Sequence, residues 1–198
     1  WIADMIRKKD AGKFIGGGEE SFGFMPGSFT RDKDGVSATS LMAEIAAWTK
    51  MNGLSLYAFL KEIYAKYGFS QEKMIYIVRK GLSGAQEIQA MMEKLRHHTP
   101  KQIAGSDIVI KKDYLTLEAT DLRSGEKTHL DFSTTSDVLQ FFLADGSKIS
   151  VRPSGTEPKI KFYFEAKVQM KDIHDFEKAQ QQANARIDEI AKELTKND

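Results

Sequence analysis

The feature that most constrains the fold of this 198-residue chain is an alternating run at residues 159–168. Ile160, Phe162, Phe164, Ala166 and Val168 alternate there with Lys161, Tyr163, Glu165 and Lys167. Because successive side chains of a strand point to opposite faces, this pattern predicts a half-buried strand of an antiparallel sheet. The Asp145-Gly146 pair predicts a hairpin turn that joins two earlier strands, 138–143 and 148–152.

Helical patterns in the same part of the chain can cover the buried face of this sheet. Residues 83–98 and 172–194 place apolar side chains at helical spacing, and Ser83 with Gln86 predicts a capping box for the first of these helices. Further strands are expected at 74–78, 107–112, 114–121 and 127–132. Residues 73–198 are therefore predicted to form an α+β domain with a mainly antiparallel sheet covered by helices.

The earlier part of the chain is dominated by two predicted helices, 36–51 and 56–67. The second carries an apolar stripe at the spacing of one helix face: Leu56, Phe59, Leu60, Ile63, Tyr64 and Tyr67. Such a stripe is typical of a helix packed into a core. A short helix within residues 1–9 and a brief strand at 14–15 are also expected. The helical spacing of apolar residues is lost from Phe69 to Glu72. This loss predicts a domain boundary near residue 72, between domains 1–72 and 73–198.

The loop at residues 152–159 joins two of the predicted strands and is suited to an anion. Its candidate phosphate ligands are Arg152, Ser154, Gly155, Thr156 and Lys159. Arginine offers a donor fork, the hydroxyls add donors, and glycine lets backbone N–H groups approach the ligand. Glu157 is expected to point away from a phosphate or to neutralise a neighbouring cation. The alternative is a hairpin loop whose cations are solvated.

Two further polar segments are candidate sugar-binding sites. Residues 16–23 place Glu19 and Ser21 on a glycine-rich turn, and a carboxylate accepts hydrogen bonds from adjacent sugar hydroxyls. The alternative is a glycine-rich connection with a solvated acidic tip. Arg31 and Lys33 could face the same ligand, although these residues taken alone favour the alternative, a charged loop that leads into a helix.

Composition excludes several classes of function. With 29 basic and 28 acidic residues, the net charge of +1 gives no global basic field for nucleic-acid binding, so a phosphate site must be local. No apolar run approaches the roughly 20 residues that cross a membrane. The absence of cysteine excludes disulfides and thiolate chemistry, and the four histidines show no zinc spacing. A cytoplasmic location is expected.

Three segments give the chain a resemblance to a known family. These segments are residues 18–23 (GEESFG), 31–35 (RDKDG) and 152–159 (RPSGTEPK). In this combination and order they resemble the motifs of the α-D-phosphohexomutases, the family of phosphoglucomutase and phosphomannomutase. The resemblance covers essentially the whole chain. It implies the C-terminal portion of an α/β third domain, the sugar-binding domain, followed by a complete phosphate-binding fourth domain.

The resemblance also implies which functions belong to this chain and which do not. Members of the family shuttle a phosphoryl group between a phosphoserine and a sugar phosphate through a hexose bisphosphate, with Mg²⁺ as cofactor. The serine and the metal ligands lie in the first two domains, so neither is expected here. The residues implied in sugar binding are Glu19, Ser21, Arg31 and Lys33, the last also a possible catalytic auxiliary. Those implied in phosphate binding are Arg152, Ser154, Gly155, Thr156 and Lys159.

The function implied is that of a C-terminal fragment of a mutase that interconverts hexose 1-phosphate and hexose 6-phosphate. Its partners would be the sugar phosphate and the missing N-terminal domains, and the fragment alone is expected to be inactive. The alternative from another class is a non-enzymatic phosphosugar-binding module. The sequence leaves open glucose, mannose, pentose or amino-sugar specificity.

Overall fold

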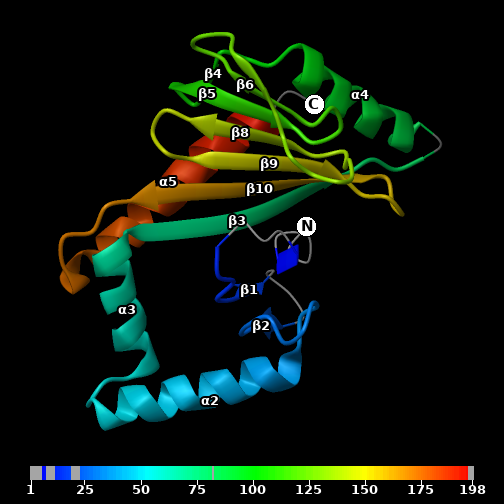
Figure 1. The fold of residues 1–198 in the computed structure, drawn as a ribbon. Coiled ribbons are helices and arrows are strands. Elements are labelled where there is room, and N and C mark those ends of the chain that lie inside the picture. Colours follow the sequence, from blue (N-terminus) through cyan, green and yellow to red (C-terminus); the bar gives the residue numbers. More distant parts are fainter. Residues whose placement is uncertain (1–5, 8–11, 19–22, 82, 196–198) are drawn as a thin grey trace. The chain divides into compact units, whose positions relative to one another are not determined.

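The computed structural model describes residues 6–7, 12–18, 23–81 and 83–195 of the chain (Figure 1). The chain divides into two compact units, Trp1–Ile63 and Tyr64–Asp198. The division falls inside helix α3 (Leu56–Tyr67). The domain limits 1–72 and 73–198 stay a prediction. No helix in the described part of the chain combines the length and the apolar character of a membrane span.

The first unit contains a small sheet and helix α2 (Gly35–Met51). Strands β1 (Gly17–Gly18) and β2 (Phe24–Met25) pair antiparallel, in place of the strand expected at 14–15. Asp34 caps α2, because its carboxylate accepts hydrogen bonds from the backbone of Val36 (3.1 Å) and Ser37 (3.0 Å). Of the helix predicted within residues 1–9, only residues 6–7 lie within the described part, and these are helical.

The predicted stripe of α3 is confirmed as helical, but none of its residues is buried; only Tyr64 of the stripe packs, partly buried, against the core of the second unit. Helix α3 has no buried residue, and α2 buries only Thr49. Trp48 is 52% exposed, although its ring lies 5.2 Å from that of Phe59. The described part of this unit contains no larger sheet than β1–β2, so the helices have little surface on which to bury their stripes.

The second unit is built on an eight-stranded sheet, with the order β3-β10-β9-β8-β5-β6-β7 and with β4 paired to β5 (Figure 1). Its strands are β3 (Phe69–Val78), β4 (Gln102–Ile103), β5 (Ser106–Asp113), β6 (Glu118–Asp121), β7 (Lys127–His129), β8 (Leu139–Leu143), β9 (Lys148–Pro153) and β10 (Lys159–Val168). All described pairs are antiparallel. The predicted α+β class and the alternation of β10 are confirmed.

Helices α4 (Gly84–His97) and α5 (Phe176–Thr195) cover one face of this sheet. The side chains of β10 that face them, from Ile160 to Ala166 at every second position, are at most 2% exposed. They pack with Ile88 and Met92 of α4 and with apolar residues of α5 in one core. The opposite face of β10 carries its polar side chains, as the period of two requires.

Three local predictions are corrected by the structure. Strand β3 begins at Phe69 rather than at Met74, because all ten of its residues pair with β10. The strand expected at 114–121 begins at Glu118, since Leu117, with φ of 55°, ends a turn after β5. Ser83 precedes α4 but makes no capping hydrogen bond with the backbone; its hydroxyl donates to the Glu87 carboxylate at 2.8 Å.

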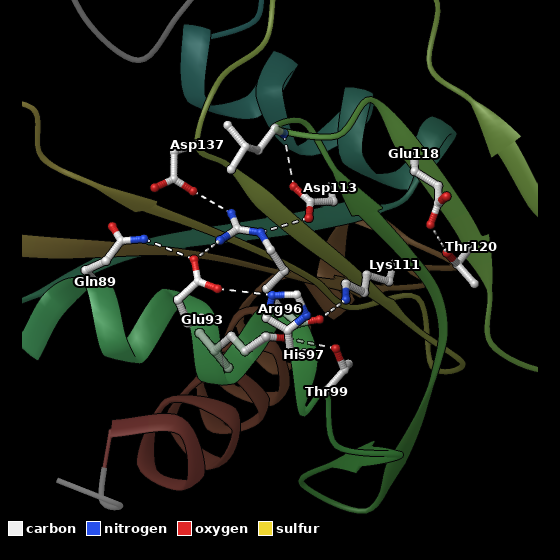
Figure 2. Close-up of polar contacts among 12 residues, drawn as sticks. Gln89, Glu93, Arg96, His97, Thr99, Lys111, Asp113, Glu118, Thr120 and Asp137 are labelled. Atoms are coloured by element: carbon white, nitrogen blue, oxygen red, sulfur yellow. Dashed lines mark hydrogen bonds and ion pairs between the residues drawn. The ribbon is translucent and has the colours of Figure 1, made fainter.

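A buried arginine fixes the C-terminal half of α4 to the sheet (Figure 2). The Arg96 side chain is 6% exposed and binds Asp113 of β5 through Nε at 2.9 Å and Asp137 through Nη2 at 2.6 Å. Its Nη1 contacts Glu93 at 3.1 Å, and Lys111 donates to its carbonyl oxygen. Burial disfavours the charged guanidinium, but the hydrogen bond to Asp137 and the charge of Asp113 outweigh burial and raise the pKa of Arg96.

We expect Arg96→Met to destabilise the second unit strongly. The substitution preserves much of the packing volume but leaves the Asp113 carboxylate buried without its cation, which costs about 3 to 5 kcal/mol. Chemical denaturation followed by circular dichroism measures the loss. Arg123→Met, which breaks the exposed pair with Asp121, is the control and should change stability far less. Equal losses in both variants would contradict this role for Arg96.

A second buried charge lies on the face of the sheet opposite the helices. Glu165 of β10 is 8% exposed, and its carboxylate is paired with Lys148 and lies 3.3 Å from Lys167. The Ser70 hydroxyl donates to it at 3.2 Å. Burial alone would raise the pKa of Glu165, but the hydrogen bond and charge of Lys148 outweigh burial and hold this pKa below its usual range.

Glu165 should therefore make stability dependent on acid pH. A carboxyl whose folded pKa is depressed stabilises the fold above its unfolded pKa of about 4.3, and this contribution is lost as the pH falls through the folded pKa. We expect Glu165→Gln to lower the free energy of unfolding at neutral pH by roughly 1.5 to 3 kcal/mol, with a smaller deficit below pH 4. Denaturation curves at several pH values measure this. A deficit that stays constant with pH would contradict it.

Candidate functional site

The loop between β9 and β10 is closed by its own backbone. The Ser154 N–H donates to the carbonyl oxygen of Lys159 at 2.8 Å, and the Lys159 N–H donates to that of Glu157 at 2.7 Å. The N–H of Thr156 donates to the Ser154 hydroxyl at 3.5 Å. Both ends of the loop are continuous with paired strands, since Pro153 pairs with Ile160. The predicted phosphate loop thus stands on a rigid base.

Arg152 lies on the polar face of the sheet, opposite the face that the helices cover. It follows Val151, which is fully buried, and is itself exposed. Among the described residues its guanidinium has neither an ion pair nor a hydrogen-bond partner. A free arginine fork at the start of this loop is available to an anion.

A cation that the sequence analysis missed lies beside Arg152. Lys161 of β10 is its direct cross-strand neighbour and is half-buried. Cβ atoms of such a pair lie about 4.5 to 5.5 Å apart, and like charges directly opposite each other are unfavourable. Two adjacent cations become favourable when an anion binds between them. The signal in the sequence was the alternation of 159–168 itself, which places Lys161 on the face of Arg152.

Glu157 is paired with a cation of its own loop. Its carboxylate forms an ion pair with Lys159, which confirms the expectation that it neutralises a neighbour. The hydrogen bond from Lys159 and then the charges of Lys159 and Lys161 lower the pKa of Glu157. Lys159, a predicted phosphate ligand, is therefore already engaged by a carboxylate, and its role in phosphate binding stays a prediction.

A surface pocket of about 550 Å³ lies between this loop and the start of α4. It is lined by the loop residues Pro153, Ser154, Gly155, Thr156, Glu157 and Pro158 and by Gly81, Ala85, Ile88 and Gln89. The pocket brings Ser154, Gly155 and Thr156 together, whereas Arg152, Lys159 and Lys161 are not among its lining residues. The N–H groups of the first turn of a helix favour negative charge at such a position.

Close backbone packing holds the start of α4 near the loop. A Cβ at Gly84 would stand 2.2 Å from the carbonyl oxygen of Arg79, so only glycine fits there. The N–H of Arg79 in turn donates to the carbonyl oxygen of Pro158 at 2.9 Å. The guanidinium of Arg79 also contacts Glu87 of α4 at 3.5 Å. The loop, Arg79 and α4 are thus linked by direct contacts.

The predicted sugar-binding residues belong to the first unit. Arg31 is exposed, and Lys33, 21% exposed at its side chain, lies 3.7 Å from the Asp32 carboxylate. Glu19 and Ser21 lie outside the described residues, so their assignment stays a prediction. The strands that precede and follow them in sequence pair closely: a Cβ at Gly18 would stand 2.7 Å from the ring of Phe24.

The described residues do not fit a magnesium site. No group of three or more His, Cys, Asp or Glu side chains in the described part of the chain could hold a metal ion. The carboxylates nearest the loop and α4, such as Glu157 and Glu87, are each paired with cations. What these residues offer chemically is anion recognition by cations, hydroxyls and backbone N–H groups.

Comparison with known proteins shows that the two parts of the chain match two successive domains of one family. The family model for the phosphoglucomutase/phosphomannomutase C-terminal domain matches residues 85–181, and that for alpha/beta/alpha domain III of the same family matches residues 1–67. The chain belongs to the phosphoglucomutase/phosphomannomutase family. It contains the C-terminal part of that family's architecture, as the motifs at 18–23, 31–35 and 152–159 implied. The predicted fold class, part of an α/β third domain followed by an α+β fourth domain, is confirmed.

Curated phosphoglucomutases resemble this family member along most of its length. It is 35% identical to phosphoglucomutase of Staphylococcus aureus (strain MRSA252) over 188 residues, which is 94% of this chain and 33% of the relative. It is 34% identical to phosphoglucomutase of Staphylococcus haemolyticus over 168 residues, 84% of this chain and 30% of the relative. The chain spans about a third of the length of these relatives.

A solved structure has a similar fold. The phosphoglucomutase pp63/parafusin from Paramecium, in its open form, matches with a TM-score of 0.56 and 23% sequence identity. The match covers 96% of this chain and 32% of that one. This likeness supports the fold of the present chain. The candidate site depends instead on the geometry of the β9–β10 loop.

Proposed function

We propose that this chain is the substrate-recognition part of a phosphohexomutase that interconverts hexose 1-phosphate and hexose 6-phosphate through a bisphosphorylated sugar. The observation that carries the proposal is the free, exposed guanidinium of Arg152, with Lys161 opposite it, at the start of a backbone-closed loop. Membership of the family makes a sugar phosphate the natural anion. Full-length relatives are about three times longer, so further domains would complete the enzyme.

The two units divide the substrate between them in this proposal. Residues of the β9–β10 loop bind the phosphate that is not reacting: Arg152, Ser154, Gly155, Thr156 and Lys159, joined by Lys161. Residues of the first unit bind the sugar hydroxyls: Glu19, Ser21, Arg31 and Lys33. Because the bisphosphorylated sugar must bind in either orientation, both groups recognise features shared by its two ends. Binding energy at the remote phosphate then positions the reactive end.

The chain's own chemistry is limited to binding and charge stabilisation. A bidentate contact from Arg152 fixes the direction of the phosphate, and the hydroxyls of Ser154 and Thr156 donate to its remaining oxygens. Lys33 is a candidate for stabilising charge near the transferred group. The phosphorylated serine and the magnesium ligands are proposed to lie in other domains of a longer, cytoplasmic enzyme. A non-enzymatic phosphosugar-binding module is the second candidate.

Turnover separates these two candidates. We expect this chain alone to give no conversion of glucose 1-phosphate to glucose 6-phosphate, because the proposed nucleophile lies elsewhere. A longer protein with the same 198 residues and the preceding domains should convert it. A coupled assay for glucose 6-phosphate measures both. Conversion by the chain alone, or none by the longer protein, would overturn the proposal.

Arg152→Ala should weaken sugar-phosphate binding. A charge-assisted hydrogen-bonded contact contributes about 1.5 to 3 kcal/mol, which corresponds to a rise of roughly 10- to 150-fold in Kd. Calorimetric titration of this chain with glucose 1-phosphate measures the effect. Arg123→Ala removes an exposed arginine at the far edge of the same sheet and should leave the Kd unchanged. Arg152→Lys keeps the charge but loses the fork, so recovery by this variant would argue against a bidentate contact.

A further inference from the structure

We propose that Glu157 competes with phosphate for Lys159 and thereby sets how tightly the loop holds its ligand. The proposal rests on the phosphate site described above. It assigns a function to the only acidic residue of the loop, which is not expected to be a phosphate ligand because a carboxylate repels a phosphate. In this role Glu157 limits affinity rather than contributing to it.

The contacts of the carboxylate support competition. Glu157 is exposed, with 59% of its side chain accessible, yet it forms an ion pair with Lys159, whose side chain is 25% accessible. The charge of Lys161 also acts on it. The carboxylate therefore already neutralises the cation that a phosphate oxygen would contact. A phosphate that contacts Lys159 must therefore share the ammonium with the Glu157 carboxylate or displace it.

The shape of the loop does not depend on this ion pair. Backbone hydrogen bonds close the turn: Ser154 N–H to Lys159 oxygen, Lys159 N–H to Glu157 oxygen, and Arg79 N–H to Pro158 oxygen. None of them uses the Glu157 side chain. An exposed ion pair adds little stability of its own. The carboxylate is therefore free to leave Lys159 without unfolding the loop.

The local charges match a single phosphate group when Glu157 is counted. Arg152, Lys159 and Lys161 contribute three positive charges, and Glu157 reduces this sum to two. A phosphate monoester carries about −1.5 to −2 at neutral pH. Without Glu157 the site would carry excess positive charge and would hold a phosphate longer. In a mutase that must turn a bisphosphorylated sugar to its other orientation, a phosphate held too long would slow turnover.

The test is phosphate affinity in a variant that keeps the shape of Glu157 and removes its charge. We expect Glu157→Gln to tighten the binding of inorganic phosphate to this chain by about two- to fivefold, the range of an exposed ion pair. Titration followed by NMR chemical shifts measures the Kd. In a Lys159→Gln background the same substitution should tighten binding less, because the contested cation is gone and only the repulsion between Glu157 and phosphate remains. Equal tightening in both backgrounds would overturn competition for Lys159.

A matched control separates local competition from net charge. Glu126→Gln makes the same change in charge at an exposed position between β6 and β7, at the far edge of the sheet, and should leave the Kd unchanged. Equal tightening in both variants would overturn competition in favour of a general charge effect. Weaker binding by Glu157→Gln would also overturn it, since Glu157 would then orient Lys159 toward the ligand.

Two variants separate the role of Glu157 from the phosphate site itself. Phosphate binding that is weakened by Arg152→Ala but unchanged by Glu157→Gln would overturn the inference and leave the phosphate site in place. Phosphate binding that Arg152→Ala does not alter would instead overturn the proposed site, and the inference with it.

Discussion

The antiparallel register of β10 between β3 and β9 is the constraint on which the second unit and its site depend. One set of its side chains, at most 2% exposed, forms the core with α4 and α5. A period of two then places the other set on the polar face, where Lys161 stands opposite Arg152. A slip by one residue would bury the cations and expose the core, so packing itself fixes the position of the candidate phosphate ligands.

The site is held from its helical side by two contacts of different kinds. At the start of α4, the absence of a Cβ at Gly84 lets the helix approach the carbonyl of Arg79, and the N–H of Arg79 donates to Pro158 of the β9–β10 loop. At the other end, Arg96 ties the same helix to the sheet through Asp113 and Asp137. In several systems buried ion pairs specify one packing arrangement more than they add stability. Here the ion pairs of Arg96 specify the position of α4 on the sheet.

The cations near the loop attract an anion, and the Glu157 carboxylate neutralises one of these cations. Arg152 and Lys161 have neither an ion pair nor a hydrogen bond of their side chains with the described residues, whereas Lys159 is paired with Glu157. In the proposed mutase such a balance suits a ligand that must bind firmly enough to be positioned and leave fast enough to turn over. Glu165, in contrast, is a carboxylate whose cations serve the stability of the same sheet face.

The sequence by itself determined most strands of the second unit, the main helices, the candidate anion loop and the family, because alternation, helical spacing and short motifs are local properties of the chain. The tertiary structure decided which residues from distant parts of the sequence become neighbours, because local patterns do not contain this information. Strand β3 extends back to Phe69 because β10 offers partners for it, and Lys161 joins Arg152 because the register brings them together. The pairing of Arg96 with Asp113 and Asp137 also joins residues far apart in the sequence, and only the packing of α4 on the sheet makes them neighbours.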